Sequence, residues 1–249
     1  MPGTSTTETW DAFFSDFYLR AYADDARQDE AEEQALAATR LTGCEPGGDL
    51  LDVPCGFGRH TIPLARAGYR AVGVDRSAAL LDEARKRAGS ERWPKFARAD
   101  YRELPFAEDS FDAAVNLFTS LGYLGDEEDV RVLAGIRRVL RPGGKLVIET
   151  MHRDRLVEVF NENTWHALGQ GRMLLEQRTF DVAAGVAQTT QTVIDTEGRD
   201  SRTYSVRVYT ATELLAMVAR AGFAEARAYG GFEGEPLTTT SRLVIVASA

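Results

Sequence analysis

The stretch LLDVPCGFGRHTIPLARAGYRAVGVDRS, residues 50–77, decides the fold. A short apolar run ends at Asp52, a glycine-rich turn follows, and an amphipathic helical pattern leads to a second apolar run that ends at Asp75. Glycine at positions 56 and 58 lets the backbone approach a ligand where a Cβ atom would collide. We expect a strand–turn–helix–strand unit that binds a ligand at the carboxyl ends of its strands.

Strand–helix alternation extends beyond this stretch, from about Asp49 to Met151. Short apolar runs predict buried strands, and amphipathic patterns predict helices between them. The expected strands are DLLDV, AVGVD, KFARAD, FDAAVNLF and KLVIET, and the expected helices are HTIPLARAG, SAALLDEARKRA and EEDVRVLAGIRRVL. Such alternation predicts a doubly wound α/β fold with a mostly parallel, seven-stranded Rossmann-like sheet and helices on both faces.

The two ends of the chain have other patterns. Aromatic residues at helical spacing near the N-terminus predict helices that form a lid. Three alternating segments between about Arg172 and Tyr209 predict an inserted antiparallel meander, which is too short to fold alone. We therefore expect a single domain over 1–249. Its parts are N-terminal helices (1–45), a cofactor-binding core (46–151), the inserted meander (163–209), and a closing helix with two strands (210–249).

The composition of the chain excludes several classes of function. The 249 residues carry a net charge of −9, so nothing attracts the chain as a whole to nucleic acid or to an anionic membrane. Cys44 and Cys55 are the only cysteines, and with three histidines they show no zinc-site spacing. No secretory signal and no apolar run of membrane-spanning length is present. We expect a soluble, cytoplasmic protein without a metal that acts on a small molecule.

Carboxylates end three successive predicted strands. Asp75 follows Gly58 by 17 residues, close to where an acidic residue reaches ribose hydroxyls. Thr61 stands where a dinucleotide-binding turn has its third glycine, which argues against a nicotinamide or flavin cofactor. Asp100 ends the third strand, where a carboxylate can accept a hydrogen bond from an exocyclic amine. The pattern favours a nucleoside other than a dinucleotide.

On these motifs the chain resembles the class I S-adenosylmethionine-dependent methyltransferases. The glycine turn is similar to the family's Asp-x-Gly-Cys-Gly-x-Gly turn, although proline replaces a glycine at position 54. The continuation Cys-Gly-x-Gly-Arg-His resembles a small-molecule branch of the family. The resemblance implies that Asp75 binds the ribose, that Asp100 contacts the adenine amine, and that Asn116 lies near the methionine amino group.

The resemblance also implies a full set of cofactor contacts. Arg59 either binds the methionine carboxylate or makes surface ion pairs, since helix N-termini favour anions. The candidate cofactor-binding residues are Asp52, Cys55, Gly56, Gly58, Arg59, Asp75, Arg76, Asp100, Tyr101 and Asn116, with Tyr18 and Tyr22 as lid residues. His60 is expected to pack against the sheet, and both cysteines are expected to be inert.

Candidates for the chemistry lie after the later strands. His152 directly follows the fifth strand and is the best general-base candidate, and Tyr123 follows the fourth strand. Arg207 and Tyr209, at the end of the meander, are expected to line the acceptor pocket and to point toward the transferred methyl group.

Three functions remain open from the sequence. The first is methyl transfer from S-adenosylmethionine to a nitrogen or oxygen of a small molecule, with S-adenosylhomocysteine as the product. The second is noncatalytic binding of the same cofactor in a regulatory protein, and the third is a Rossmann-type oxidoreductase. The meander could also serve as a surface for a homodimer.

Overall fold

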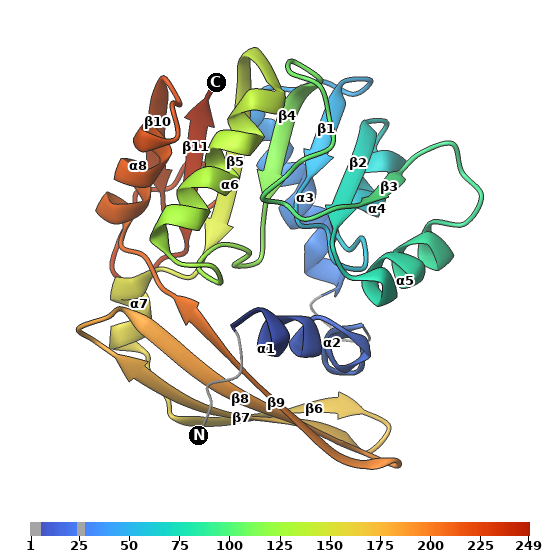
Figure 1. Cartoon of the computed structure of the whole chain (residues 1–249), viewed down its shortest axis with the longest axis vertical. Coiled ribbons are helices and arrows are strands. Elements are labelled where there is room, and N and C mark those ends of the chain that lie inside the picture. The colour runs from blue at the N-terminus through green and yellow to red at the C-terminus, as the bar shows by residue number, and fades with distance from the viewer. Residues whose placement is uncertain (1–5, 24–27) are drawn as a thin grey trace.

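A seven-stranded sheet forms the core of the computed structural model, which describes residues 6–23 and 28–249 (Figure 1). Its strand order is β10-β11-β5-β4-β1-β2-β3. Neighbouring strands from β3 to β5 are parallel, and β11 runs antiparallel to both β5 and β10. The strands are β1 (Asp49–Asp52), β2 (Arg70–Asp75), β3 (Lys95–Arg98), β4 (Phe111–Asn116), β5 (Leu140–Thr150), β10 (Glu225–Tyr229) and β11 (Leu243–Ser248). The predicted doubly wound, mostly parallel sheet is confirmed.

Helices cover both faces of this sheet because its strands carry apolar side chains on both sides. On β1, Leu50 packs in a cluster with residues of α3 and α4, whereas Leu51 packs in a cluster with residues of α6 and α8. The helices are α3 (Gln28–Thr42), α4 (Thr61–Arg66), α5 (Ala78–Ala88), α6 (Asp126–Val139) and α8 (Ala211–Arg220). Within residues 6–23 and 28–249, no helix has the length and apolar character needed to cross a membrane.

The inserted meander has four antiparallel strands in the order β6-β7-β8-β9, one more than the alternation predicts. They are β6 (Asn163–Gly169), β7 (Arg172–Asp181), β8 (Val186–Asp195) and β9 (Gly198–Arg207), and α7 (Arg153–Glu158) precedes them. The additional strand, β6, lies at the edge of the sheet and has no buried residue. Because β6 buries no residue, its sequence lacks the alternation of apolar and polar residues by which the other three strands can be recognised.

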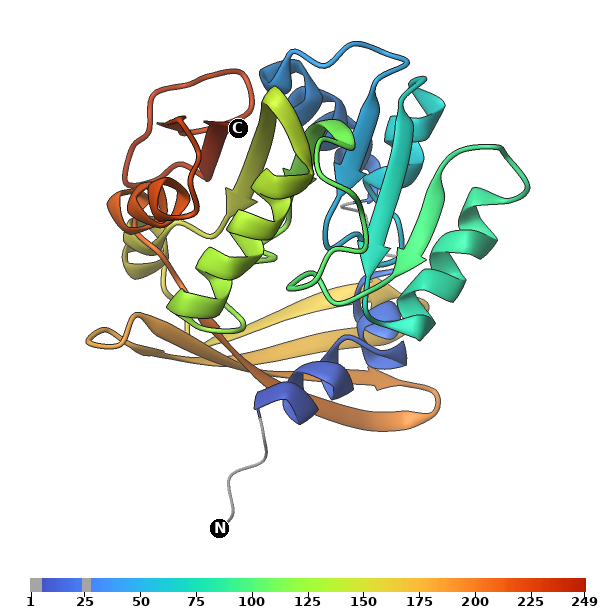
Figure 2. The same cartoon turned by 45° about the horizontal axis from the view of Figure 1, so that its top comes forward.

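The four-stranded sheet lies below the carboxyl ends of the core strands, and two N-terminal helices lie between the two sheets (Figures 1 and 2). These helices are α1 (Thr6–Phe13) and α2 (Asp16–Tyr22). Arg20 forms ion pairs with Asp195 (2.6 Å) and Asp200 (3.2 Å) of the meander. On the core side, Arg76 pairs with Asp11 (2.8 Å). The predicted lid is thus attached to both sheets; residues 1–5 and 24–27 of the predicted N-terminal region lie outside the described residues.

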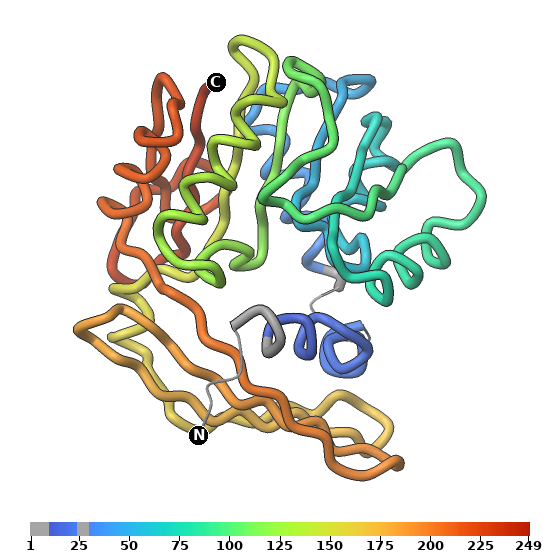
Figure 3. Tube along the Cα trace, viewed as in Figure 1, coloured from blue at the N-terminus to red at the C-terminus, as the bar shows by residue number. Residues whose placement is uncertain are grey.

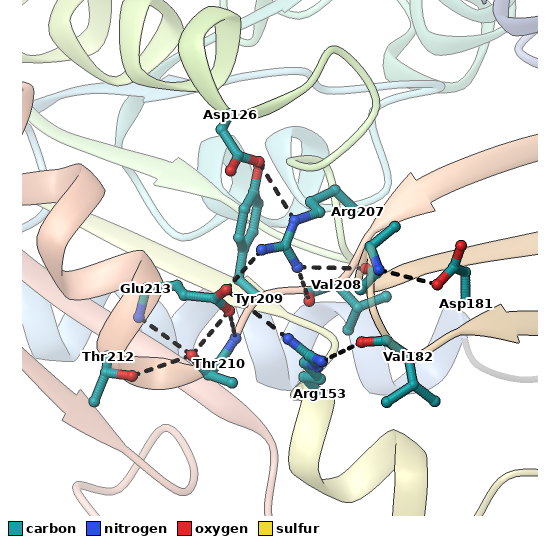
Figure 4. A network of polar contacts seen from close by, with 12 residues as sticks. Asp126, Arg153, Asp181, Val182, Arg207, Val208, Tyr209, Thr210, Thr212 and Glu213 are labelled. Carbon is teal, nitrogen blue, oxygen red and sulfur yellow. Dashed lines mark hydrogen bonds and ion pairs between the residues drawn. The ribbon is translucent and has the colours of Figure 1, made fainter.

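The chain enters the meander through α7 and returns to the core between β9 and α8 (Figure 3). A polar network joins these two crossings (Figure 4). Arg207 donates hydrogen bonds to Glu213 (2.6 Å) and to the carbonyl of Val208 (2.9 Å), and Arg153 of α7 donates to the carbonyl of Val182 (2.6 Å). The network fixes the orientation of the four-stranded sheet relative to the core.

Gly122 packs directly against the backbone of Arg207, where the meander returns to the core. The Arg207 amide donates to the Gly122 carbonyl (2.8 Å), and a Cβ atom at Gly122 would lie 2.2 Å from the Arg207 carbonyl oxygen. Its φ of +98° also favours glycine.

We expect Gly122→Ala to destabilise the protein by more than about 1 kcal/mol, because strain and a backbone collision act together. The matched control is Gly125→Ala, which has a φ of +89° but no neighbouring atom within 4 Å of the added Cβ. Urea unfolding measures both variants. Equal losses of stability would show that the contact with Arg207 is unimportant and that only the backbone conformation matters.

Candidate functional site

A cavity of about 580 Å³ lies where the core sheet, the lid helices and the meander meet. This volume is within the range of small-molecule sites. Its walls come from the turns after β1, β2, β4 and β5, from α1 and α2, and from the facing side of β7, β8 and β9. The cavity is at the carboxyl ends of the parallel strands, where open α/β sheets bind ligands.

The glycine turn after β1 forms one wall. Cys55, Gly56 and Arg59 line the cavity. Gly56 has a φ of +54°, and a Cβ atom added to it would have no neighbour within 4 Å, so this part of the turn faces open space. Gly58, with a φ of +79°, does not line the cavity; an added Cβ would lie 3.1–3.3 Å from Phe96, Ile62 and Ala84. Gly58 thus permits close helix packing instead of backbone approach to a ligand.

Asp75 is connected to this turn. Its carboxylate accepts hydrogen bonds from the amides of Gly56 (2.9 Å) and Ser77 (2.8 Å), and the side chain lines the cavity. Burial raises the pKa of Asp75, although the two amide donors oppose the shift. A carboxylate has about four acceptor positions, so two remain for hydroxyl groups of a ligand.

Asp52 and Asn116 do not line the cavity, contrary to the expected direct contacts with a cofactor. Asp52 is buried and accepts a hydrogen bond from the Thr61 hydroxyl (2.5 Å). The Asn116 amide donates to the Val53 carbonyl (2.7 Å). Both side chains form hydrogen bonds with protein groups next to the turn, so they stabilise the conformation of the turn without facing the cavity.

Burial raises the pKa of Asp52 to about 7, so its ionisation costs folding free energy. Since the folded pKa exceeds the usual 3.8, the folded chain binds the additional proton, and this group lowers stability as pH rises from about 4 to 7. Asp52→Asn should therefore stabilise the protein progressively across this window, by up to about 4 kcal/mol relative to wild type. Urea unfolding from pH 4 to 8 measures it; a pH-independent difference would contradict a protonated Asp52.

Of the three predicted cofactor-binding residues after β2 and β3, namely Arg76, Asp100 and Tyr101, one does not line the cavity. Tyr101 and Arg76 line the cavity, whereas Asp100 does not, because its carboxylate is paired with Arg102 (2.6 Å) and lies 3.6 Å from Arg76. Trp10 of α1 lines this side too, 5.8 Å from the Tyr101 ring and 4.8 Å beneath the Arg76 guanidinium. Trp10 was not a predicted site residue, since its helical spacing is equally typical of a core position.

Tyr18 and Tyr22 of α2 line the cavity, as expected of lid residues, with their rings 4.6 Å apart. The Tyr22 hydroxyl accepts a hydrogen bond from Gln191 of β8 (2.6 Å). Arg59 reaches across from the glycine turn, and its guanidinium lies 4.3 Å from the centre of the Phe118 ring. Lid, turn and meander therefore meet around one space.

His152 is 3% exposed and lines the cavity. Neither ring nitrogen has a hydrogen-bond partner within residues 6–23 and 28–249, although the Asp154 carboxylate lies 3.4 Å from Nε2. Tyr123 lines the same space, and burial raises its pKa well above the ordinary value. His60 also lines the cavity while buried against the core, and burial lowers its pKa to about 3, which keeps it neutral.

Arg207 and Tyr209 do not line the cavity, so the structure shows no contact that supports their predicted place in the acceptor pocket. Side chains alternate along a strand, and on β9 Tyr204 and Val206 are the ones that face the cavity. Tyr209 lies beyond the strand, beside Asp126 (Figure 4). Its hydroxyl donates hydrogen bonds to Asp129 (2.7 Å) and Asp126 (3.1 Å) of α6. The sequence pattern predicts that the meander forms a wall of the pocket, but it does not predict which face of β9 points to the cavity.

Comparison with known proteins agrees with this site. Residues 50–144 match the sequence model of a family described as "Methyltransferase domain". A demethylmenaquinone methyltransferase of Clavibacter sepedonicus is 35% identical over 113 residues, 45% of this chain and 45% of that protein. The chain thus spans about half the length of such curated relatives.

Two further proteins are similar to this chain over most of its length. A cypemycin N-terminal methyltransferase of Streptomyces sp is 28% identical over 207 residues, 80% of this chain and 82% of that protein. The solved structure of S-adenosylmethionine-bound CalS10, an amino pentose methyltransferase from Micromonospora echinaspora, is 26% identical with a TM-score of 0.71, covering 93% of this chain and 96% of that one. The matched family and each of these proteins are described as methyltransferases.

Proposed function

We propose that this protein transfers a methyl group from S-adenosylmethionine to a nitrogen or oxygen nucleophile of a small molecule. The observation that carries the proposal is a single cavity that joins a nucleoside-type site, Gly56 and Asp75, to a second wall supplied by the meander. A donor and an acceptor can therefore meet in one enclosed space. The amine is the first nucleophile to test, because two relatives carry names that refer to an N-terminus and to an amino pentose.

The residues present fit S-adenosylmethionine. Asp75 keeps acceptor capacity for two ribose hydroxyls, and the open space at Gly56 admits the ligand against the backbone. Tyr101 and Trp10 offer ring surfaces for adenine, and Arg59 offers a cation for the methionine carboxylate. Asp52 and Asn116 would act indirectly, by holding the turn.

When bound, S-adenosylmethionine supplies a methyl carbon that its sulfonium makes electrophilic. The chain then has to align the acceptor with that carbon and exclude water. The lid helices and the meander contribute to both, because their side chains line the parts of the cavity that the core sheet does not supply. As the acceptor's lone pair forms the new bond, the carbon–sulfur bond breaks and its electron pair stays with sulfur.

His152 is the residue that we propose to accept the acceptor's proton. It lines the cavity after β5, and no hydrogen bond to the described residues occupies its ring nitrogens. Tyr123 lies on the same side and would contact the acceptor through its ring. The enclosed second wall distinguishes this proposal from noncatalytic binding, which needs no acceptor space.

Asp75→Ala should weaken binding of S-adenosylhomocysteine at least tenfold, since two charge-assisted hydrogen bonds are worth about 1.5–3 kcal/mol. Titration calorimetry measures it, with exposed Asp82→Ala as the matched control. Wild-type chain that binds NADH and not S-adenosylhomocysteine would instead support an oxidoreductase.

His152→Gln should lower kcat by about 10²–10⁴ for an acceptor that arrives protonated, because general-base catalysis is lost. Affinity for S-adenosylhomocysteine should stay within about threefold, since the base faces the acceptor. Turnover with a panel of amines and phenols checks the first value, and calorimetry checks the second. Unchanged kcat with every active acceptor would remove His152 from the chemistry.

A further inference from the structure

The turn after β4 has an unusual backbone. Phe118 and Thr119 both adopt left-handed conformations, with φ of +61° and +54°, and both line the cavity. Thr119 is β-branched, a residue type that rarely occupies this region. Such conformations persist only where surrounding structure enforces them, and they concentrate at ligand sites.

Glu149, near the end of β5, accepts hydrogen bonds from both residues of this turn. Its carboxylate accepts a hydrogen bond from the Phe118 amide (2.9 Å), and its carbonyl accepts one from the Thr119 amide (3.2 Å). The side chain is only 9% exposed, and its other carboxylate oxygen accepts a hydrogen bond from Arg242 (3.0 Å), which immediately precedes β11. One buried carboxylate thus joins the ends of β4, β5 and β11 at the cavity.

The turn in its left-handed form presents the Phe118 ring to the cofactor side of the cavity. The guanidinium of Arg59 lies 4.3 Å from the centre of that ring, and the ring of lid residue Tyr22 lies 6.1 Å from it. If the turn relaxed to an ordinary conformation, the ring would move and its contact with the Arg59 guanidinium would be lost. The path from Glu149 to Arg59 therefore runs through the backbone of two strained residues.

We propose that Glu149 is a positioning residue for the methyl donor: it holds the Phe118–Thr119 turn in its left-handed conformation and so fixes Arg59 at the methionine end of the cofactor site. This inference rests on the proposed function. Glu149 itself lines the cavity, and the action that we assign to it is the one through the turn.

The test is rescue by glycine, which adopts positive φ without the cost that a side chain imposes. Glu149→Ala should weaken binding of S-adenosylhomocysteine about tenfold because the turn loses its anchor. Adding Thr119→Gly should restore part of the affinity, because glycine adopts positive φ without strain, although the hydrogen bond from the Met151 amide to the Thr119 hydroxyl (3.1 Å) is lost. Adding Ser120→Gly, one residue further at a position without positive φ, should restore nothing. Glu149→Gln, which keeps an oxygen for the Phe118 amide, should retain most of the affinity.

Titration calorimetry well below the melting temperature, with circular dichroism as the check on folding, separates positioning from stability. Exposed Glu127→Ala is the control glutamate and should bind as wild type. Wild-type affinity in Glu149→Ala, or a double variant no better than Glu149→Ala, would overturn the inference while leaving the proposed function intact. Failure of the wild-type chain itself to bind S-adenosylhomocysteine would overturn both.

Discussion

The hydrogen bond from the Gly56 amide to the buried carboxylate of Asp75 connects the turn after β1 to the end of β2. A carboxylate buried to 7% exposure is stable only with such donors, and the Ser77 amide supplies the second. The turn can reach Asp75 because β1 and β2 are parallel neighbours, so their carboxyl ends lie at the same edge. The wall of the cavity that Gly56 and Asp75 line is held together by this contact.

The meander turns an open edge into an enclosed space. Two connecting segments, α7 and the chain between β9 and α8, join the meander to the core. Arg207 holds the second of these in place through its hydrogen bonds to Glu213 and to the Gly122 carbonyl in the turn after β4. That same turn lines the cavity and is held by Glu149. Residues 118–122 therefore contact Glu149 through Phe118 and the meander through Gly122, and they include two non-glycine residues with positive φ, Phe118 and Thr119.

Much of this arrangement follows from the sequence. Period-two and period-3.6 patterns place the core strands and helices, because burial on both faces leaves apolar residues at regular spacing. The same patterns do not reveal β6, whose edge position imposes no alternation, or the face that β9 turns to the cavity. Motif spacing placed Asp52, Asp100 and Asn116 near the site, but their hydrogen bonds and ion pairs with the protein set their direction, and those arise only in the folded chain. The left-handed pair Phe118–Thr119 has no signal in sequence at all, since neither residue prefers that conformation.

A crystal structure of the protein with S-adenosylhomocysteine would show directly whether the cavity is the cofactor site. We expect the ribose hydroxyls at the Asp75 carboxylate, the homocysteine part of the ligand beside Gly56, and the sulfur directed into the space between His152 and the β7–β9 wall. Electron density for the ligand outside this cavity, or a sulfur that faces away from the meander, would contradict it.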